Sequence, residues 1–240
     1  HEQAFAGVEA ASDRMCIASG GKIMMPLSAQ DVCFGANYDG CDGGMIDTPW
    51  DYISESGAVT GGQYKGSGPF GSGFCQDFTL PHCHHHGPQG NDPYPAEGAP
   101  GCPQASSPEH SNKCDSEAES PHNDFSKDKC TFSGESQTAS SPNSIKQMIM
   151  KGGPVETAFT VYTDFENYAG GIYHHVSGSV AGGHAVKIVG WGSENGVEYW
   201  KIANSWNPYW GEEGYFRIRL GEGGVDDMVV GSSADATWTC

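Results

Sequence analysis

The chain has 240 residues, 35 of them glycine, and a formal net charge of −18. This length corresponds to one large domain or two small lobes, which bury roughly 70% of the surface of the unfolded chain. The acidic excess disfavours nucleic acid and anionic membranes as partners, because both need a basic surface. No apolar run approaches the ~20 residues that would span a bilayer.

The first quarter of the chain predicts three helices. Residues 4–17 are rich in alanine and repeat apolar side chains at every third or fourth position. Ser28, followed three residues later by Asp31, indicates the start of a second helix. Residues 45–56 predict a third helix, whose Pro49 favours a late N-terminal boundary.

The composition then changes over residues 61–144, where glycine, proline, serine, histidine and asparagine dominate and five of the nine cysteines lie. So long a loop without cross-links is uncommon in a compact domain, so we interpret it as a disulfide-linked surface insertion. Residues 144–150 predict a short helix, and residues 155–161, 184–191, 198–203 and 214–220 predict strands. Helices followed by strands favour an α+β fold with two lobes.

The nine cysteines lack the paired C-x-x-C or C-x-x-H spacing of zinc sites. Disulfides are therefore favoured, together with an oxidising location that is lysosomal, vacuolar or extracellular. Because nine is odd, at least one cysteine has no partner within this chain.

His184 follows two glycines at the start of a predicted strand, a place suited to a general base. An amide oxygen from Asn204 would hold its second ring nitrogen, and Trp206 would shield that bond from water. Each residue alone has a plainer interpretation: strand histidines are more often merely packed, and asparagine often marks a turn. Their combination is more specific than any one of them.

Four segments carry a resemblance to the papain family. The run from Gly182 to Leu220 resembles the C-terminal half of that family, and Cys41-Asp42-Gly43-Gly44 resembles its Cys-x-Gly-Gly segment. Residues 5–16 resemble the helix behind the nucleophile in cathepsin B-like members. Residues 74–86, with Cys102, resemble the occluding loop of the same subgroup.

The resemblance implies a papain-like two-lobed α+β fold, with a helical lobe, an antiparallel β-barrel-like lobe and an active-site cleft between them. We expect one peptidase domain over residues 1–240, with a mainly helical lobe in 1–74, a disulfide-stapled occluding-loop region in 75–130 and a mainly β lobe in 131–240. It further implies a peptide or protein substrate or ligand, with a propeptide or a cystatin-like inhibitor as a further partner. No cofactor and no metal are expected, because three successive histidines, 84–86, do not readily converge on one ion.

Site roles follow from the same resemblance. His184 takes the place of the catalytic imidazole and Asn204 that of its orienting amide. The residues that would contact substrate are Gly43 and Gly44 through their backbone, Trp206 over the catalytic pair, Trp210 on the primed side, His85 and His86 in the occluding loop, and Met228 at the floor of the S2 pocket. In the family, one loop histidine docks the loop and the other receives a peptide's C-terminal carboxylate. Met228 favours an apolar P2 side chain, because a thioether cannot pair a buried cation.

The sequence departs from the family at the nucleophile. Its position falls on Glu2, and Gln3 takes the place of the aromatic residue that follows. A carboxylate is a poor nucleophile toward an amide. At the N-terminus of a helix we expect it instead to form an ion pair with His184.

By resemblance, Cys83 is expected to bond to Cys102, Cys33 to Cys114 and, more weakly, Cys75 to Cys130. Cys16 and Cys41 correspond to cysteines whose family partners lie upstream of the nucleophile, and Cys240 has no counterpart.

Three hypotheses for function remain open at this point. The first is a catalytically inactive, peptide-binding pseudopeptidase. The second is an active lysosomal or secreted cysteine peptidase, a dipeptidyl carboxypeptidase or endopeptidase, whose N-terminus is truncated or misassigned. The third is a structural subunit of an extracellular assembly.

Overall fold

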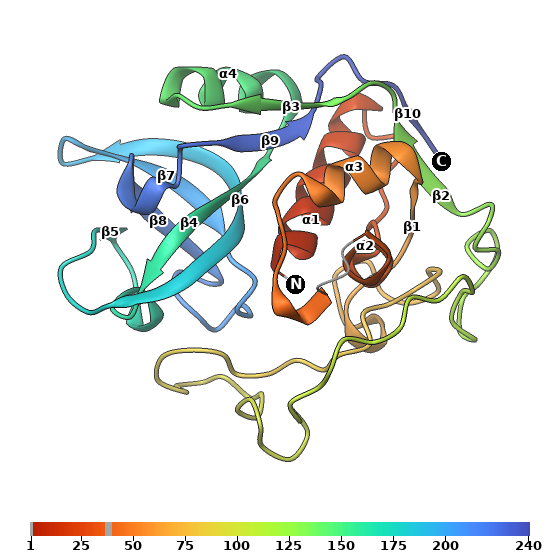
Figure 1. Ribbon diagram of the computed structural model, residues 1–240, viewed down its shortest axis with the longest axis horizontal. Helices are drawn as coiled ribbons and strands as arrows, with labels where there is room; N and C mark the ends of the chain where they lie inside the picture. Colours follow the sequence, from red (N-terminus) through yellow and green to blue (C-terminus); the bar gives the residue numbers. More distant parts are fainter. Residues whose placement is uncertain (1, 37–39) are drawn as a thin grey trace.

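A computed structural model of the chain describes residues 2–36 and 40–240, and it contains a helical part and a sheet-rich part (Figure 1). The α-helices described are α1 (Glu2–Ala18), α2 (Ala29–Ala36), α3 (Thr48–Glu55) and α4 (Pro142–Gly152), with short 3₁₀ turns η1 (Gly40–Asp42), η2 (Tyr64–Gly66), η3 (Phe165–Asn167) and η4 (Glu222–Gly224). The four predicted α-helices are therefore confirmed.

The helix starts have local causes. The hydroxyl of Ser28 accepts a hydrogen bond from the Asp31 backbone N–H at 3.0 Å, which caps α2. Helix α3 begins at Thr48 with a proline in its first turn, which is the late start that Pro49 predicted. Helix α4 begins two residues before its predicted start, because Ser141 and Ser144 form a reciprocal capping box.

The strands form two sheets. Their bounds are β1 (Ala58–Val59), β2 (Lys129–Phe132), β3 (Ser136–Ala139), β4 (Val155–Tyr162), β5 (Ile172–Tyr173), β6 (Val180–Glu194), β7 (Val197–Ala203), β8 (Tyr215–Arg219), β9 (Val229–Ser232) and β10 (Trp238–Thr239). The seven-stranded sheet has the order β3-β9-β4-β6-β7-β8-β5, and the small sheet has the order β1-β2-β10. Among the strands described, the β5–β8 pair is parallel and the other pairs are antiparallel.

The four predicted strands correspond to β4, β6, β7 and β8. The remaining strands have two to four residues each, which is too short to show a period in the sequence.

Two apolar cores lie on either side of the α1–β6 contact. The first gathers α1, α2 and α3 and also contains Phe132 and Trp238 from the small sheet. The second lies on the large sheet, around Trp200 and Phe216. Because α1 packs against both β4 and β6, its N-terminal end comes to lie beside the large sheet (Figure 1).

Polar contacts fix how α1 lies on the large sheet. The buried guanidinium of Arg14 donates to the Gly153 carbonyl at 2.7 Å and to the Ser232 hydroxyl at 3.1 Å. Burial lowers the pKa of Arg14 to about 10. On β6, the ammonium of Lys187 contacts Asp13 of α1 at 2.9 Å. These contacts hold α1 at both β9 and β6, so the position of its first turn is set by the sheet.

Three disulfides are described, and they correct two expected pairs. Cys83 bonds to Cys102, as expected. Cys75 bonds to Cys114 and Cys130 to Cys240, so the expected pairs Cys33–Cys114 and Cys75–Cys130 are wrong. The cysteines at 16, 33 and 41 are free thiols.

Backbone pairing explains both corrections. The Asp115 N–H donates to the Cys75 carbonyl at 2.6 Å, which places Cys114 next to Cys75. Strand β10 pairs with β2 in the register Thr239–Thr131, so Cys240 reaches Cys130. Cys33 is instead buried in α2 within the first core.

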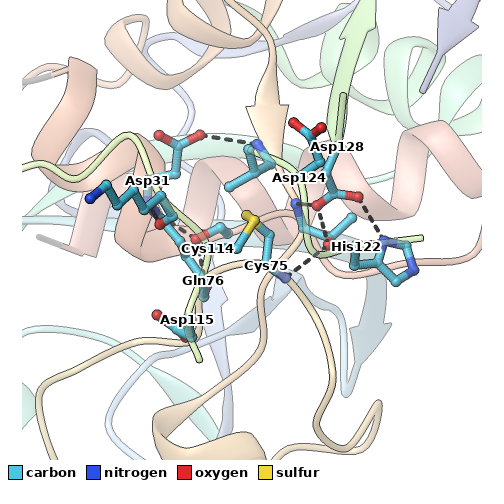
Figure 2. The surroundings of a disulfide bond; sticks show 12 residues. Asp31, Cys75, Gln76, Cys114, Asp115, His122, Asp124 and Asp128 are labelled. Atoms are coloured by element: carbon cyan, nitrogen blue, oxygen red, sulfur yellow. Dashed lines mark hydrogen bonds and ion pairs between the residues drawn. A yellow bond between two sulfur atoms is a disulfide. The ribbon is translucent and has the colours of Figure 1, made fainter. Parts of the chain in front are cut away.

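A polar network anchors the insertion around the Cys75–Cys114 bond (Figure 2). The Gln76 amide donates to the carbonyls of Ser111 and Lys113 at 2.9 and 2.8 Å. The Asp128 carboxylate accepts from the Thr60 hydroxyl at 2.6 Å and contacts His122 at 2.6 Å. The insertion is therefore cross-linked and hydrogen-bonded, although little of it is helix or strand.

Candidate active site

The first turn of α1 and the start of β6 bring Glu2 and His184 together. Glu2 is the first residue of α1, His184 lies in β6 and Asn204 directly follows β7. Glu2 Oε1 lies 4.0 Å from His184 Nδ1. On the other side of the ring, Nε2 lies 2.7 Å from Asn204 Oδ1. His184 is thus held between a carboxylate and an amide oxygen, and its side chain is only 6% exposed.

The electrostatics of Glu2 follow from this contact. The His184 ring is the largest influence and lowers the pKa of the Glu2 carboxyl well below its usual range, although partial burial opposes the shift. Glu2 is therefore an anion at any pH near neutrality. An anion at the first turn of α1 also lies at the positive end of the helix dipole.

Aromatic rings cover the His184–Asn204 pair. Trp206 stacks on His184 with ring centroids 4.9 Å apart and an interplanar angle of 23°. Trp210 meets Trp206 edge-on at 5.0 Å, and both indoles are buried. The cover excludes water from the His184–Asn204 hydrogen bond, which strengthens it.

The insertion over residues 61–144 also contacts Trp206, the indole that stacks on His184. The ring of His86 lies 4.4 Å from that of Trp206, and its Nδ1 is 3.8 Å from Glu166 Oε1. Desolvation by surrounding atoms lowers the pKa of His85, and the neighbouring His86 acts in the same direction. The His86 ring therefore contacts the indole that covers His184, and the His85 ring lies 6.4 Å from that of His86.

A hydrogen bond joins Gly43 to the first turn of α1. The side-chain amide of Gln3 donates to the Gly43 carbonyl at 3.1 Å. A side chain added at Gly182 or Gly183, the two residues before His184, would meet no described atom within 4 Å. Gly44 is exposed next to Gly43.

Met228 immediately precedes β9, and its side chain is 43% exposed. Its carbonyl accepts from the Thr157 hydroxyl at 3.1 Å, which fixes this turn to β4. The structure places the thioether at the surface of the large-sheet part.

Two further residues, next to Trp206, were not predicted from the sequence as part of the site. Asp92, in the insertion, accepts a hydrogen bond from the Asn207 side chain at 2.8 Å, and Asn207 directly follows Trp206. The only sequence signal was the run Asn91-Asp92-Pro93, which indicates a turn but not its partner.

Among the residues that the structure describes, no group of histidine, cysteine, aspartate or glutamate side chains is arranged to hold a metal ion. Within the same residues, no helix is long and apolar enough to cross a membrane.

Comparison with known proteins agrees with this fold. Residues 3–233 match the papain family of cysteine proteases, and the chain belongs to that family. Its relatives place it with the cathepsin B-like members. It is 40% identical over 235 residues to cathepsin B-like cysteine proteinase 6 of Caenorhabditis elegans, covering 95% of this chain and 58% of that protein. It is 42% identical over 236 residues to a cathepsin B-like cysteine proteinase of Schistosoma japonicum, covering 95% of this chain and 64% of that protein.

Among solved structures, procathepsin B S9 from Trypanosoma congolense matches with a TM-score of 0.75 at 27% identity, covering 97% of this chain and 68% of that one. The papain-like fold is thereby confirmed. The chain spans less than two thirds of the length of the two curated relatives named above.

Proposed function

We propose that this chain binds peptides in a cathepsin B-like cleft and does not cleave them, because Glu2 occupies the position of the nucleophile. The observation that carries the proposal is the 4.0 Å contact between Glu2 Oε1 and His184 Nδ1. In an active member of the family, a thiolate would pair with this imidazole. A carboxylate pairs with it electrostatically but forms no productive acyl intermediate.

The rest of the site supports binding. The backbone at Gly182 and Gly183, next to His184, has no described atom within 4 Å of an added side chain, and an extended peptide would form backbone hydrogen bonds with Gly43 and Gly44. Met228 would line an apolar P2 site, and Trp210 would line the primed side. His85 and His86 would receive a C-terminal carboxylate.

The compartment and partners belong to the same proposal. Three disulfides suit a lysosomal, vacuolar or extracellular location. The matching procathepsin B S9 structure is that of a proenzyme, which supports a propeptide as a ligand of the same cleft. A cystatin-like inhibitor is a further ligand that such a cleft would accept.

An active cysteine peptidase is the second candidate. It is favoured by the intact geometry of His184, Asn204 and Trp206, since an inactive protein has no need of an oriented imidazole. This candidate requires a cysteine where this sequence has Glu2.

One experiment separates the two candidates. The purified protein is treated at pH 5.5 with a thiol-directed epoxide, the adduct is located by peptide mass, and binding of a fluorescent peptide with a free C-terminus is measured in parallel. We expect no adduct at position 2 and retained peptide binding. Mapping to the residue is needed because Cys16, Cys33 and Cys41 are also free thiols.

Two variants calibrate the assay. Glu2→Cys should gain one adduct at position 2, whereas the matched control Glu2→Ser should gain none. A stoichiometric adduct at position 2 of the unaltered protein would show a cysteine there and establish the active peptidase instead. Absence of both labelling and peptide binding would refute both candidates.

A further inference from the structure

A pocket of about 180 Å³ lies between α2 and the insertion. Gln30 of α2 lines one wall, and Gln76 and Asp115 of the insertion line another, close to the Cys75–Cys114 bond (Figure 2). The residues assigned above to the peptide cleft are not part of its described lining. Pockets that take drug-sized ligands have about 300–1,000 Å³, so this one has room for a group the size of a single residue.

Gln30 presents a hydrogen-bond donor to this pocket. The residue is 9% exposed, and its Oε1 accepts from the Thr79 N–H at 3.0 Å and from the Thr79 hydroxyl at 3.2 Å. A backbone N–H can only donate, so the oxygen of the amide must be the atom on that side. The NH₂ group of Gln30 is therefore the part of the amide that is left for a ligand.

Gln76 has the opposite orientation and presents an acceptor. The residue is 3% exposed, and its amide nitrogen donates to the carbonyls of Ser111 and Lys113 at 2.9 and 2.8 Å. Because a carbonyl can only accept, the nitrogen of the amide must lie on that side. The Oε1 atom of Gln76 is then left for a ligand.

Both of these free amide groups are open to solvent. Among the residues described, the side-chain atoms that are buried without a partner belong to Glu156, Asn204 and Trp238, and to neither glutamine. Buried polar side chains are nearly always hydrogen-bonded, so two buried glutamines that each keep one group free indicate a ligand or water in the pocket. The bonds that orient the two amides also hold them in place before a ligand arrives, which lowers the cost of binding.

The pocket also carries negative charge. Asp115 Oδ2 accepts from the Asp77 N–H at 2.8 Å, which leaves Oδ1 for a ligand. Burial of the carboxyl raises the pKa of Asp115, and the nearby charges of Asp77 and Glu117 act in the same direction. A carboxylate that is crowded by other acids is stabilised when a cation binds beside it. Glu109 also lines the pocket and adds a further carboxylate.

A donor and several acceptors in one small pocket narrow the choice of ligand. A metal ion takes oxygen ligands and would find no use for the NH₂ group of Gln30. The cationic end of a lysine or arginine side chain has donors only, so it too would leave Gln30 without an acceptor. An anion would be repelled by Asp115. The ligand should therefore carry a cation and an acceptor close together.

We propose that this pocket binds the N-terminal residue of a peptide. The α-ammonium group would lie against the free oxygens of Asp115 and Gln76, and the first carbonyl would accept from the NH₂ group of Gln30. A peptide N-terminus carries a cation and an acceptor within one residue, and its capture is a recurring mode of peptide recognition. The pocket is separate from the cleft, so this proposal does not depend on the proposed function.

Three small probes test the two halves of the contact. They are alanyl-alanine amide, its N-acetylated form, which lacks the cation, and butylamine, which lacks the carbonyl. Binding is followed by NMR through the amide signals of Gln30, Thr79 and Ser111. The pH is 7, at which an α-amino group is mostly cationic and an ordinary imidazole mostly neutral, because His110 also lines the pocket. We expect saturable shifts with alanyl-alanine amide and at least about fivefold weaker binding of the other two probes.

A charge-removing variant tests the role of Asp115. Asp115→Asn keeps an oxygen for the Asp77 N–H but removes the charge, so it should weaken binding of alanyl-alanine amide about fivefold. Asp124→Asn is the matched control and should leave binding unchanged. Asp124 belongs to the same insertion, and its Oδ1 accepts from the Ser126 N–H at 3.1 Å, but it is not part of the described lining of this pocket.

A second variant tests the donor. Gln30→Glu keeps an acceptor for Thr79 and replaces the donor by an oxygen, so the preference for alanyl-alanine amide over butylamine should disappear. If Asp115→Asn does not fold, judged by circular dichroism, Glu109→Gln removes a charge from an exposed side chain that lines the pocket. That variant should weaken binding of alanyl-alanine amide about twofold.

Several results would overturn the proposal. They are equally tight binding of the acetylated peptide or of butylamine, and equal affinities in Asp115→Asn and Asp124→Asn. The amide signals of Gly182 and Gly183 report the cleft separately. If these signals move and those of Gln30 and Thr79 do not, the pocket proposal fails and the proposed function stands. If only the signals of Gln30 and Thr79 move, the pocket is supported and the proposed function is not.

Discussion

The Cys130–Cys240 disulfide should be a major source of stability, and the structure allows its size to be worked out. It joins residues 110 positions apart. In the chain-entropy account, closing a loop of that length in the unfolded state stabilises the fold by about 4.8 kcal/mol at 25 °C. Domains of this kind are stable by only about 5–15 kcal/mol, so the loss would be a large fraction of the total.

The fold also shows what depends on this bond. Strand β10 contributes only two residues to the small sheet, and its Trp238 packs 5.0 Å from Phe132 in the first core. Without the disulfide, this two-residue strand is held mainly by its pairing with β2 and by Trp238. We therefore expect the core around Trp238 to loosen when the bond is removed.

The assay is urea unfolding at pH 6, followed by tryptophan fluorescence. The double variant Cys130→Ser, Cys240→Ser should lose about 3–5 kcal/mol of unfolding free energy. The control Cys83→Ser, Cys102→Ser removes a bond of separation 19, for which the same account gives about 3.2 kcal/mol. Because residues 83–102 lie at the surface, removal of the Cys83–Cys102 bond should lower the unfolding free energy by less than that. A loss below about 1 kcal/mol in the first variant, or a larger loss in the control, would refute this reasoning.

Three further predictions concern the site. His184 lowers the pKa of Glu2, so the ion pair stabilises the fold above the unfolded-state pKa of about 4.5 and is lost as the pH falls. Glu2→Gln should therefore cost about 1 kcal/mol in urea unfolding at pH 6 and less at pH 3, and an equal cost at both would contradict the ion pair. Met228→Glu should shift a peptide library from apolar P2 residues toward arginine, and an arginine preference in the unaltered protein would exclude the assigned role. Since the pKa of His85 is lowered, its cationic contribution to the preference for free-acid over amidated peptides should be present in acid and should fade, as the pH rises, before pH 6.5 is reached. Equal binding of both forms at pH 5 would refute this role of His85.

Much of the fold could be predicted from the sequence, because each of the longer helices and strands has a recognisable pattern among neighbouring residues. The periodicity of residues 4–17, the cap at Ser28 and the alternation in residues 155–161 are properties of neighbouring residues, and each predicted an element that the structure contains. The pairing of His184 with Asn204 was predicted from a resemblance in residue type and order, and the structure brings the two ring nitrogens to Asn204 and Glu2.

Disulfide partners and loop contacts were decided only by the tertiary structure. Cys240 meets Cys130 because a two-residue strand pairs in one particular register, and no local pattern marks so short a strand. Asp92 meets Asn207 across 115 residues of chain because the whole large sheet places them together. A sequence states which groups need partners, but the choice among distant partners depends on how the cores pack, which is a property of the complete fold.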